Sequence, residues 1–293
     1  MARNRRIRFV SELFIYRLLT LVISLLPRRT ALALGAFLGR LAPFILIGRK
    51  RLAEANMRLA LRELDNHQVR QEVRKMFIHL GIVGMELLML KRFHAEPDLS
   101  RFFEFHHPEF LEQAYKRGRG VLLLTAHLGF WEAGTFFLPK LGYPTAFIAK
   151  KMKNPRMDSY LTQIREMSGG EIIDAKRGAR RILKALNEGK VVCVLPDQDN
   201  RDGEPVDFFG RPARTTTMVA QLANKTGAAV VPGFTYRSPD NRYHNYFDEP
   251  LKLCGGNTPE TILENTRMVN EVIERAIRRE PSQWFWLHHR WRL

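Results

Sequence analysis

His127 and Glu132, five residues apart, are side chains of the types that general-base chemistry needs. Glu132 could hydrogen-bond one ring nitrogen of His127, which would fix its tautomer and stabilise the imidazolium. The other ring nitrogen could then take a proton from an attacking hydroxyl. No serine or cysteine nucleophile is needed, because the substrate supplies the oxygen. The pattern therefore predicts transfer of a group to a hydroxyl, and the alternative is a hydrogen-bonded pair with a purely structural role.

The residues around this pair predict where it lies in the fold. Residues 121–124 are consecutive aliphatics, which suits a strand buried on both faces, and Gly129 predicts a turn into a helix. His127 would follow the carboxyl end of that strand, and Glu132 would lie in the first turn of the helix. Open α/β sheets bind ligands at this edge. The imidazole is therefore expected to meet a substrate.

Strands alternating with helices along the chain predict an α/β domain with a mixed, largely parallel sheet flanked by helices. The expected strands are residues 102–105, 121–124, 143–150, 171–173, 190–195, 228–236 and, as an edge strand, 243–247. The expected helices are residues 66–91, 108–117, 133–141, 155–167, 178–187, 217–226 and 259–279. Residues 197–214 are rich in glycine, proline and charge, which favours a functional loop.

Composition limits the domain count, the compartment and the kind of partner. The 293 residues allow one large domain or two small ones, and a hydrophobic share of 45% is enough for a substantial core. Cys193 and Cys254 show neither metal-site spacing nor a disulfide framework, which favours a reducing cytoplasmic location. The formal net charge of +17 predicts an anionic partner: nucleic acid, acidic lipid headgroups or an acidic carrier protein.

The positive charge is concentrated beside the most apolar segments. Residues 1–62 hold thirteen Lys or Arg against two Glu, a balance of +11 out of +17. Apolar residues 9–26 are long enough to cross a bilayer, but they contain one Glu and one Arg, which also suits a helix in the headgroup region. Residues 31–47 predict a further interfacial helix pair or hairpin. We therefore expect residues 1–48 to anchor the α/β domain at 49–293 to a membrane, and the alternative is a helix packed on the protein's own core.

A second chemical motif ends another apolar strand. Asp197 and Asp199 follow residues 191–195 and should point into the same crevice as His127. The spacing of Asp197, Asp199 and Asp202 loosely suggests a calcium loop, but the glycine and glutamate that such a loop requires are out of register. No metal and no cofactor is expected.

Several ordered blocks resemble one known family. They are the His-x-x-x-x-Glu motif at 127–132, the run Val-Val-Cys-Val-Leu-Pro-Asp-Gln-Asp at 191–199, Val-Val-Pro-Gly-Phe at 230–234 and the aromatic tail at 283–291. Together they resemble the lipid A secondary acyltransferase (lauroyl/myristoyl transferase) family of the bacterial glycerolipid acyltransferase superfamily. The resemblance covers nearly the whole chain.

The resemblance implies a membrane-associated O-acyltransferase on the cytoplasmic face of the inner membrane. It implies acyl carrier protein thioester as the donor. The implied acceptor is a Kdo-bearing tetraacyl lipid A precursor, acylated on the hydroxyl of an existing 3-hydroxyacyl chain. The expected partners are thus acyl carrier protein, an anionic glycolipid and inner-membrane lipids, and nucleic acid is not expected.

The resemblance also implies substrate-binding residues. Arg165, within the segment 164–170, is expected to contact a phosphate or the oxyanion of the tetrahedral intermediate. Backbone N–H groups after His127 are the alternative oxyanion donors. Asp197 could hydrogen-bond an acceptor sugar hydroxyl or fix an arginine. The next cationic candidates are Lys176, Arg177 and Arg180.

Two aromatic segments suggest contacts with lipid. The loop at 206–217 resembles a family loop that usually reads Pro-Phe-Phe-Gly, with Asp207 where proline is common. Phe208 and Phe209 could line the acyl slot or simply pack the loop. The tail at 284–291 interleaves aromatic and basic groups, which suits a membrane-interface belt, and core packing is its alternative.

Two other functions stay open. One is acyl transfer to another glycolipid or to a lysophospholipid. The other is a non-catalytic scaffold that binds lipid or nucleic acid through its positive charge. Replacing His127 by alanine separates the scaffold from an enzyme, because a binding module keeps its function when a catalytic base is removed.

Overall fold

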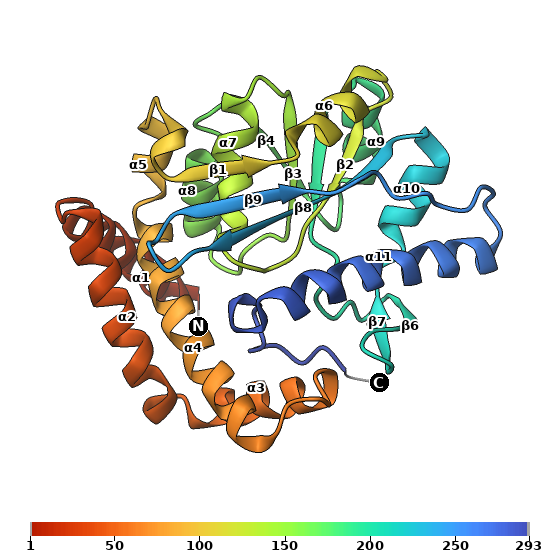
Figure 1. Ribbon diagram of the computed structural model, residues 1–293. Helices are drawn as coiled ribbons and strands as arrows, with labels where there is room; N and C mark the ends of the chain where they lie inside the picture. The colour runs from red at the N-terminus through yellow and green to blue at the C-terminus, as the bar shows by residue number, and fades with distance from the viewer. Residues whose placement is uncertain (1, 292–293) are drawn as a thin grey trace.

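The computed structural model describes residues 2–291 and is built around a seven-stranded sheet (Figure 1). Its strand order is β1-β9-β8-β2-β5-β3-β4. Every neighbouring pair runs parallel except β8 with β9, which confirms the predicted mixed, largely parallel sheet. The strands are β1 (Phe103–His106), β2 (Val121–Leu124), β3 (Thr145–Ala149), β4 (Glu171–Asp174), β5 (Val191–Val194), β8 (Ala229–Arg237) and β9 (Tyr243–Phe247).

Helices cover both faces of the sheet, as predicted. Side chains of β2 alternate between two cores: Leu122 and Leu124 belong to one, and Val121 and Leu123 to the other. A strand buried on both faces carries a continuous apolar run, which is why the sequence identifies it. The first core includes α9 (Ala179–Asn187), α10 (Met218–Thr226) and α11 (Pro259–Arg279), and the second α6 (Pro108–Lys116), α7 (Gly134–Lys140) and α8 (Pro155–Arg165).

The prediction that residues 243–247 form an edge strand is wrong. β9 lies between β1 and β8, and the edges are β1 and β4. Tyr243, Asn245 and Phe247 are buried while the residues between them are half-buried. The sequence shows this alternation, but the neighbours that cover the strand come from distant parts of the chain, and a local pattern does not identify them.

A short hairpin occupies part of the segment that was predicted to be a loop. β6 (Glu204–Asp207) pairs antiparallel with β7 (Pro212–Thr215). Phe209 and Gly210 turn the chain between them with φ values of 58° and 70°. Asn270 of α11 donates a hydrogen bond to the carbonyl of Asp207 over 2.6 Å, which holds the hairpin against the core.

The chain before the sheet folds, within residues 2–291, into α1 (Ala2–Ser24), α2 (Arg28–Ile45), α3 (Ile47–Ala60), α4 (Asn66–Leu88) and α5 (Leu90–Ala95). Glycines allow α2 and α4 to meet backbone to backbone. A Cβ on Gly81 would lie 2.1 Å from the carbonyl oxygen of Gly35, and one on Gly39 would lie 2.4 Å from that of Phe77. The helix α2 is therefore packed on the helix that leads into the α/β body.

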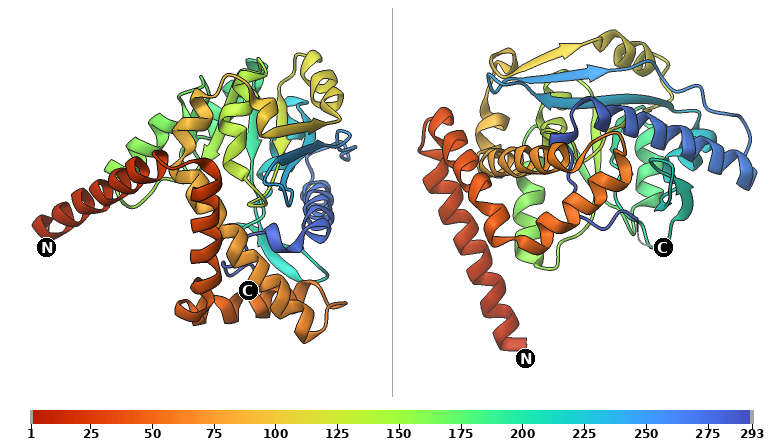
Figure 2. Two further views of the ribbon diagram at one scale, coloured as in Figure 1. Left: turned by 60° about the vertical axis from the view of Figure 1, so that its left-hand side comes forward. Right: turned by 60° about the horizontal axis from the view of Figure 1, so that its bottom comes forward.

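The helix α1 projects from the rest of the molecule (Figure 2). Its contact with α8 involves both charged residues of the apolar run. The side chain of Asn154 donates to the carbonyl of Phe9 and to Glu12, each over 2.9 Å. The guanidinium of Arg17 lies 4.7 Å from the ring centre of Tyr160. These charges are thus turned towards the protein.

Exposed apolar side chains gather on α1, α2 and the start of α3. Seventeen of the twenty-one exposed large apolar side chains in the described chain lie between Ile7 and Ile47. Taken singly, none of the helices in residues 2–291 combines the length and the apolar composition needed to cross a membrane. The pair α2 and α3 passes jointly but is bent by 93°. The anchor at 1–48 and the division from 49–293 therefore stay predictions.

The aromatic tail belongs to the core rather than to the surface. Trp284, Trp286 and Arg290 are fully buried. The guanidinium of Arg290 donates to the hydroxyl of Thr215 over 2.7 Å. Of the two alternatives for 284–291, core packing is confirmed for these three residues and the membrane-interface belt is wrong for them, because their polar groups find partners inside the protein.

Candidate active site

Strand pairing brings His127 and Asp197 together. β2 and β5 are neighbours, and Leu124 pairs with Val194. His127 and Asp197 each follow three residues later, so both leave the sheet at the same edge. His127 Nδ1 lies 2.8 Å from Asp197 Oδ1, and the backbone N–H of His127 donates to Asp197 Oδ2 over 2.9 Å. This carboxylate holds both the ring and the backbone of the histidine, and the two residues are called the dyad below.

The carboxylate of Asp197 is fully buried and ionised. Besides His127, it accepts a hydrogen bond from Trp284 Nε1 over 2.8 Å. Burial alone would raise the pKa of Asp197, but the imidazole charge of His127 and the hydrogen bonds from His127 and Trp284 hold that pKa well below its usual range. A fixed negative charge therefore lies against the ring.

The second ring nitrogen of His127 is left for a substrate. Asp197 holds Nδ1, and the His127 side chain is 27% exposed, so Nε2 is the nitrogen that a ligand can reach. Burial alone would lower the pKa of His127, but the charge and hydrogen bond of Asp197, and then the charge of Glu132, raise it above its ordinary value. The arrangement favours a ring that accepts a proton at Nε2 and is stabilised once charged.

Glu132 does not hold the histidine, which corrects the predicted His127–Glu132 pair. Both oxygens of Glu132 accept hydrogen bonds from Arg165, from Nε over 2.9 Å and from Nη2 over 2.6 Å. A guanidinium fork matches a carboxylate in this way, and Asp197 already occupies Nδ1 of the ring. Glu132 instead raises the pKa of His127 through its charge, and it brings Arg165 to the side of the dyad.

Three backbone donors at and just after His127 are already engaged. The N–H of His127 bonds the dyad carboxylate, that of Leu128 bonds within its own turn, and that of Gly129 donates to the carbonyl of Gln283 over 3.0 Å. These three groups therefore do not face a substrate. Arg165 and the N–H groups at the start of the following helix keep their predicted oxyanion role as proposals.

A pocket of about 550 Å³ lies beside the dyad. The backbone N–H of Phe285, in its wall, donates to the carbonyl of His127 over 3.0 Å, so the wall lies next to the dyad, although neither dyad residue lines the pocket. Arg49 of α3 donates to the carbonyl of Leu287 over 3.0 Å, which links α3 to the tail in the pocket wall. The pocket thus combines the α2–α3 bend, the segment after β5 and the tail. Its lining residues are Leu46, Arg49, Gln198, Asp199, Phe285, Leu287, His288 and His289.

The other predicted cationic residues are not part of this pocket wall. Lys176, Arg177 and Arg180 are exposed at the end of β4 and the start of α9. The backbone N–H of Lys176 donates to Asp174 over 3.0 Å, which shapes the turn there. The contact of these three residues with substrate is not tested by their positions and stays a prediction.

Phe208 and Phe209 lie in the core, and neither lines the pocket. The Phe208 ring centre lies 5.9 Å from that of Trp284, and the guanidinium of Arg290 lies 4.5 Å over the Phe208 ring. Phe208 thus packs behind the indole that bonds Asp197. Their position agrees with the alternative prediction, in which these aromatics pack the loop.

Trp284 and His288 are site residues that the sequence reasoning missed. Trp284 donates to the dyad carboxylate, and His288 lines the pocket. Burial lowers the pKa of His288 to about 4, so this ring is neutral. The alternation of aromatic and basic residues in the tail was the one signal in the sequence. Only the fold shows that the tail reaches the end of β5.

Known proteins are similar to this chain in sequence over most of its length. The family model described as bacterial lipid A biosynthesis acyltransferase matches residues 1–293. The chain is 30% identical over 280 residues to the lipid A biosynthesis lauroyltransferase of Escherichia coli (strain K12), covering 94% of this chain and 89% of that one. It is 26% identical over 270 residues to the palmitoleoyltransferase of lipid A biosynthesis from the same organism, with coverages of 91% and 86%. The phosphatidylinositol mannoside acyltransferase of Mycobacterium tuberculosis (strain ATCC 25618 / H37Rv) is 29% identical over 187 residues, with coverages of 62% and 57%.

Proposed function

Because the chain belongs to the bacterial lipid A biosynthesis acyltransferase family and is an acyltransferase, we propose that it acylates a hydroxyl of a (Kdo)2-lipid A precursor from an acyl carrier protein thioester. The observation that supports this proposal most directly is the His127–Asp197 dyad beside a pocket. This dyad replaces the His127–Glu132 base expected from the sequence.

His127 Nε2 is the general base of the proposed reaction. It takes the proton of the acceptor hydroxyl while that oxygen attacks the carbonyl carbon of the thioester. The tetrahedral intermediate then collapses: the carbon–sulfur bond breaks, the ester forms, and Nε2 returns its proton to the leaving thiolate. Asp197 stabilises the imidazolium between these steps and holds the tautomer in which Nε2 is free.

Cations beside the dyad suit the negative charges of this reaction. Arg165, held in place by Glu132, is the proposed contact for the oxyanion or for a phosphate. Arg49 lies in the pocket wall, where a phosphate of the glycolipid would meet it. The net charge of +17 suits the acidic surface of a carrier protein.

The lipid acceptor enters, in this proposal, from the membrane side. The exposed apolar residues of α1 and α2 lie in the headgroup region of the cytoplasmic face of the inner membrane. Leu46, at the bend between α2 and α3, belongs both to this apolar surface and to the pocket wall. A lipid could therefore reach the dyad without leaving the interface.

Another anionic glycolipid is the second candidate acceptor. The similarity to a phosphatidylinositol mannoside acyltransferase supports it. The dyad would act in the same way on any hydroxyl held near Nε2, so the two candidates differ in the acceptor and not in the base.

A direct assay tests this function. The full chain in detergent is incubated with acyl carrier proteins bearing different chains and with either tetraacyl (Kdo)2-lipid A precursor or phosphatidylinositol mannoside, and the products are weighed by mass spectrometry. One added acyl chain on the lipid A precursor is expected. His127→Ala should lower turnover by about 10²- to 10⁴-fold, the usual contribution of a positioned base.

An exposed histidine away from the pocket provides the matched control. His67, in the first turn of α4, should tolerate His67→Ala with full activity. Acylation of the mannoside alone would move the assignment to the second candidate. Undiminished turnover by His127→Ala would remove the dyad from the mechanism.

A further inference from the structure

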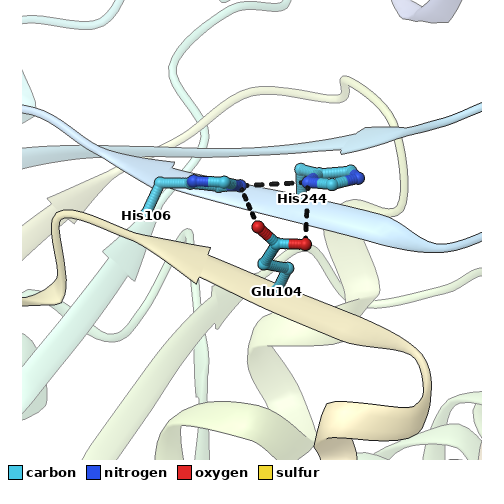
Figure 3. Close-up of side chains that lie close together, drawn as sticks. All are labelled: Glu104, His106 and His244. Atoms are coloured by element: carbon cyan, nitrogen blue, oxygen red, sulfur yellow. Dashed lines mark hydrogen bonds and ion pairs between the residues drawn. The ribbon is translucent and has the colours of Figure 1, made fainter.

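Away from the dyad, three side chains of types that can bind a metal ion lie together on the sheet (Figure 3). Glu104 and His106 belong to the edge strand β1, and His244 belongs to β9. The strands are parallel, and Glu104 pairs with His244 in register. Residues two apart in a strand share a face, so the register brings all three side chains to one place.

The spacing of the three ligand atoms fits a metal ion. They all lie within 4.8 Å of one another. His106 Nε2 is 3.0 Å from His244 Nδ1 and 3.5 Å from Glu104 Oε1, and His244 Nδ1 is 3.7 Å from Glu104 Oε2. Zinc bonds of about 2.0–2.2 Å put tetrahedral ligand atoms about 3.3–3.6 Å apart. The three groups are thus separated by 3.0–3.7 Å, with a different oxygen of Glu104 nearest to each ring, and a small turn of that carboxylate brings one oxygen into a tetrahedral position.

A divalent cation satisfies this cluster better than a proton does. A neutral imidazole has one lone pair, and a carboxylate offers only acceptors. One proton on either facing nitrogen can bridge the rings, because the other nitrogen accepts it, but neither nitrogen then has a proton to donate to the carboxylate of Glu104. A cation at the centre satisfies all three groups at once.

The surroundings hold the ligands and leave a path for an ion. The ring of His106 stacks on Tyr246 with centres 4.2 Å apart, and Arg279 covers the Tyr246 ring at 3.7 Å. The side chains of His106 and His244 are each 26% exposed, and that of Glu104 is 46% exposed. The cluster is therefore ordered on one side and open to solvent on the other.

We propose that Glu104, His106 and His244 form a zinc site with a fourth position open to water or to an external ligand. In the described sheet, β1 pairs with β9 alone, so the ion ties the edge strand to the body. The site is independent of the dyad and of the proposed function.

Zinc titration of the full chain tests the site. The protein in detergent is stripped with a chelator, titrated with zinc chloride in a calorimeter and assayed for metal content after dialysis. One zinc per chain is expected. Glu104→Gln, His106→Gln and His244→Gln should each weaken binding at least as much as loss of an outer-shell partner, about 10- to 100-fold.

The neighbouring His107 gives a close control. It is exposed and lies 3.1 Å from Glu109, so it resembles a cluster histidine without the third ligand. His107→Asn should bind zinc like the unaltered chain, since asparagine tolerates its φ of 54°. Equal binding by the control and the three cluster variants, or no bound zinc in the unaltered chain, would overturn the site.

Two further measurements use the unaltered chain and do not depend on variant folding. Cobalt in place of zinc should give the intense visible absorption of a four-coordinate ion, and a weak octahedral spectrum would refute the tetrahedral site. Zinc should also slow hydrogen exchange of the β1 amides, because it fastens the edge strand. Unchanged exchange in β1 at saturating zinc would refute the tie between β1 and β9.

Discussion

At the scale of single residues, two carboxylates near His127 have separate tasks that their contacts assign. Asp197 is buried and bonds the ring, whereas Glu132 bonds Arg165. Both raise the pKa of the imidazole, but only Asp197 also fixes its tautomer. The base and the nearby guanidinium are thus held by different carboxylates.

Replacing Asp197 should change both the rate and its pH dependence. The base must be neutral, so kcat/KM should rise with pH through an apparent pKa above the ordinary histidine value of 6.5. Asp197→Asn removes the charge that raises this pKa and leaves the burial that lowers it, so the rising limb should move to lower pH. The plateau should fall by about 10²- to 10⁴-fold, since the imidazolium loses its partner. Profiles of kcat/KM against pH measure both effects.

Glu132→Gln is the matched variant for that comparison. It keeps the Asp197 bond to the ring, so the base should survive, and the limb should shift only slightly because a weaker charge effect is lost. If Glu132→Gln lost the base while Asp197→Asn kept it, the original His127–Glu132 pairing would be restored and the dyad refuted.

At the scale of elements, three glycines decide how α2 lies on α4. Gly35 and Gly39 of α2 face Gly81 of α4, and a Cβ at any of them meets backbone that cannot move aside like a side chain. Arg28 adds an ion pair to Glu86 over 2.5 Å beside this contact. The helix α2, which carries part of the exposed apolar surface, is thus fixed against the body.

Gly81→Ala should lower the stability of the fold. Alanine favours a helix, but here its methyl group would lie 2.1 Å from the carbonyl oxygen of Gly35, and overpacking of this kind costs about 1–3 kcal/mol. Gly84→Ala is the control, because a Cβ there meets nothing within 4 Å in the same helix, and it should stabilise by about 0.5–1 kcal/mol. Melting temperatures in one detergent compare the two. Equal shifts in the same direction would contradict the close contact of α2 with α4.

The sequence predicted elements better than it predicted their neighbours. Helical spacing and apolar runs identified strands such as β2 and β5 and long helices such as α4 and α11 within a few residues, because those signals are local. Strand order is not local, and it decides which side chains meet. Asp197 was placed at the correct sheet edge, but its pairing with His127 follows from β2 lying beside β5. The β6–β7 hairpin was missed because its proline and glycine resemble a loop.

The sequence reasoning missed the proposed zinc site and the role of Trp284 for the same reason. Glu104 and His244 are far apart in the chain, and no local motif links them until β1 pairs with β9. Trp284 also lies far from Asp197 in the sequence, 87 residues away. Residue spacing along the chain does not reveal a site whose residues come singly from different strands.

At the scale of the whole molecule, one surface differs from the rest. The apolar residues of α1 and α2 are exposed together, arginines flank them, and the pocket lies beside the bend between α2 and α3. This combination supports the proposed contact with an anionic membrane.

Vesicle binding tests this surface. Phe44→Glu with Ile45→Glu should weaken binding of the full chain to vesicles containing anionic lipid at least about tenfold, because these side chains are 78% exposed and burying one contributes about 1.5–3 kcal/mol. Leu141→Glu with Leu263→Glu changes exposed residues on other elements and should leave binding unchanged. Flotation of the vesicles measures the bound fraction. Equal weakening by both pairs would show that the effect is one of charge and not of this surface.

The bond from Trp284 to Asp197 has a consequence for the order of events during synthesis. A ribosome delivers α1 and α2 first, and their greasy side chains can settle on the bilayer while translation continues. Trp284 emerges only after every strand has been made, so the carboxylate of Asp197 lacks one of its hydrogen bonds until that indole docks. On the proposed function, membrane binding by α1 and α2 then precedes completion of the dyad in each newly made copy.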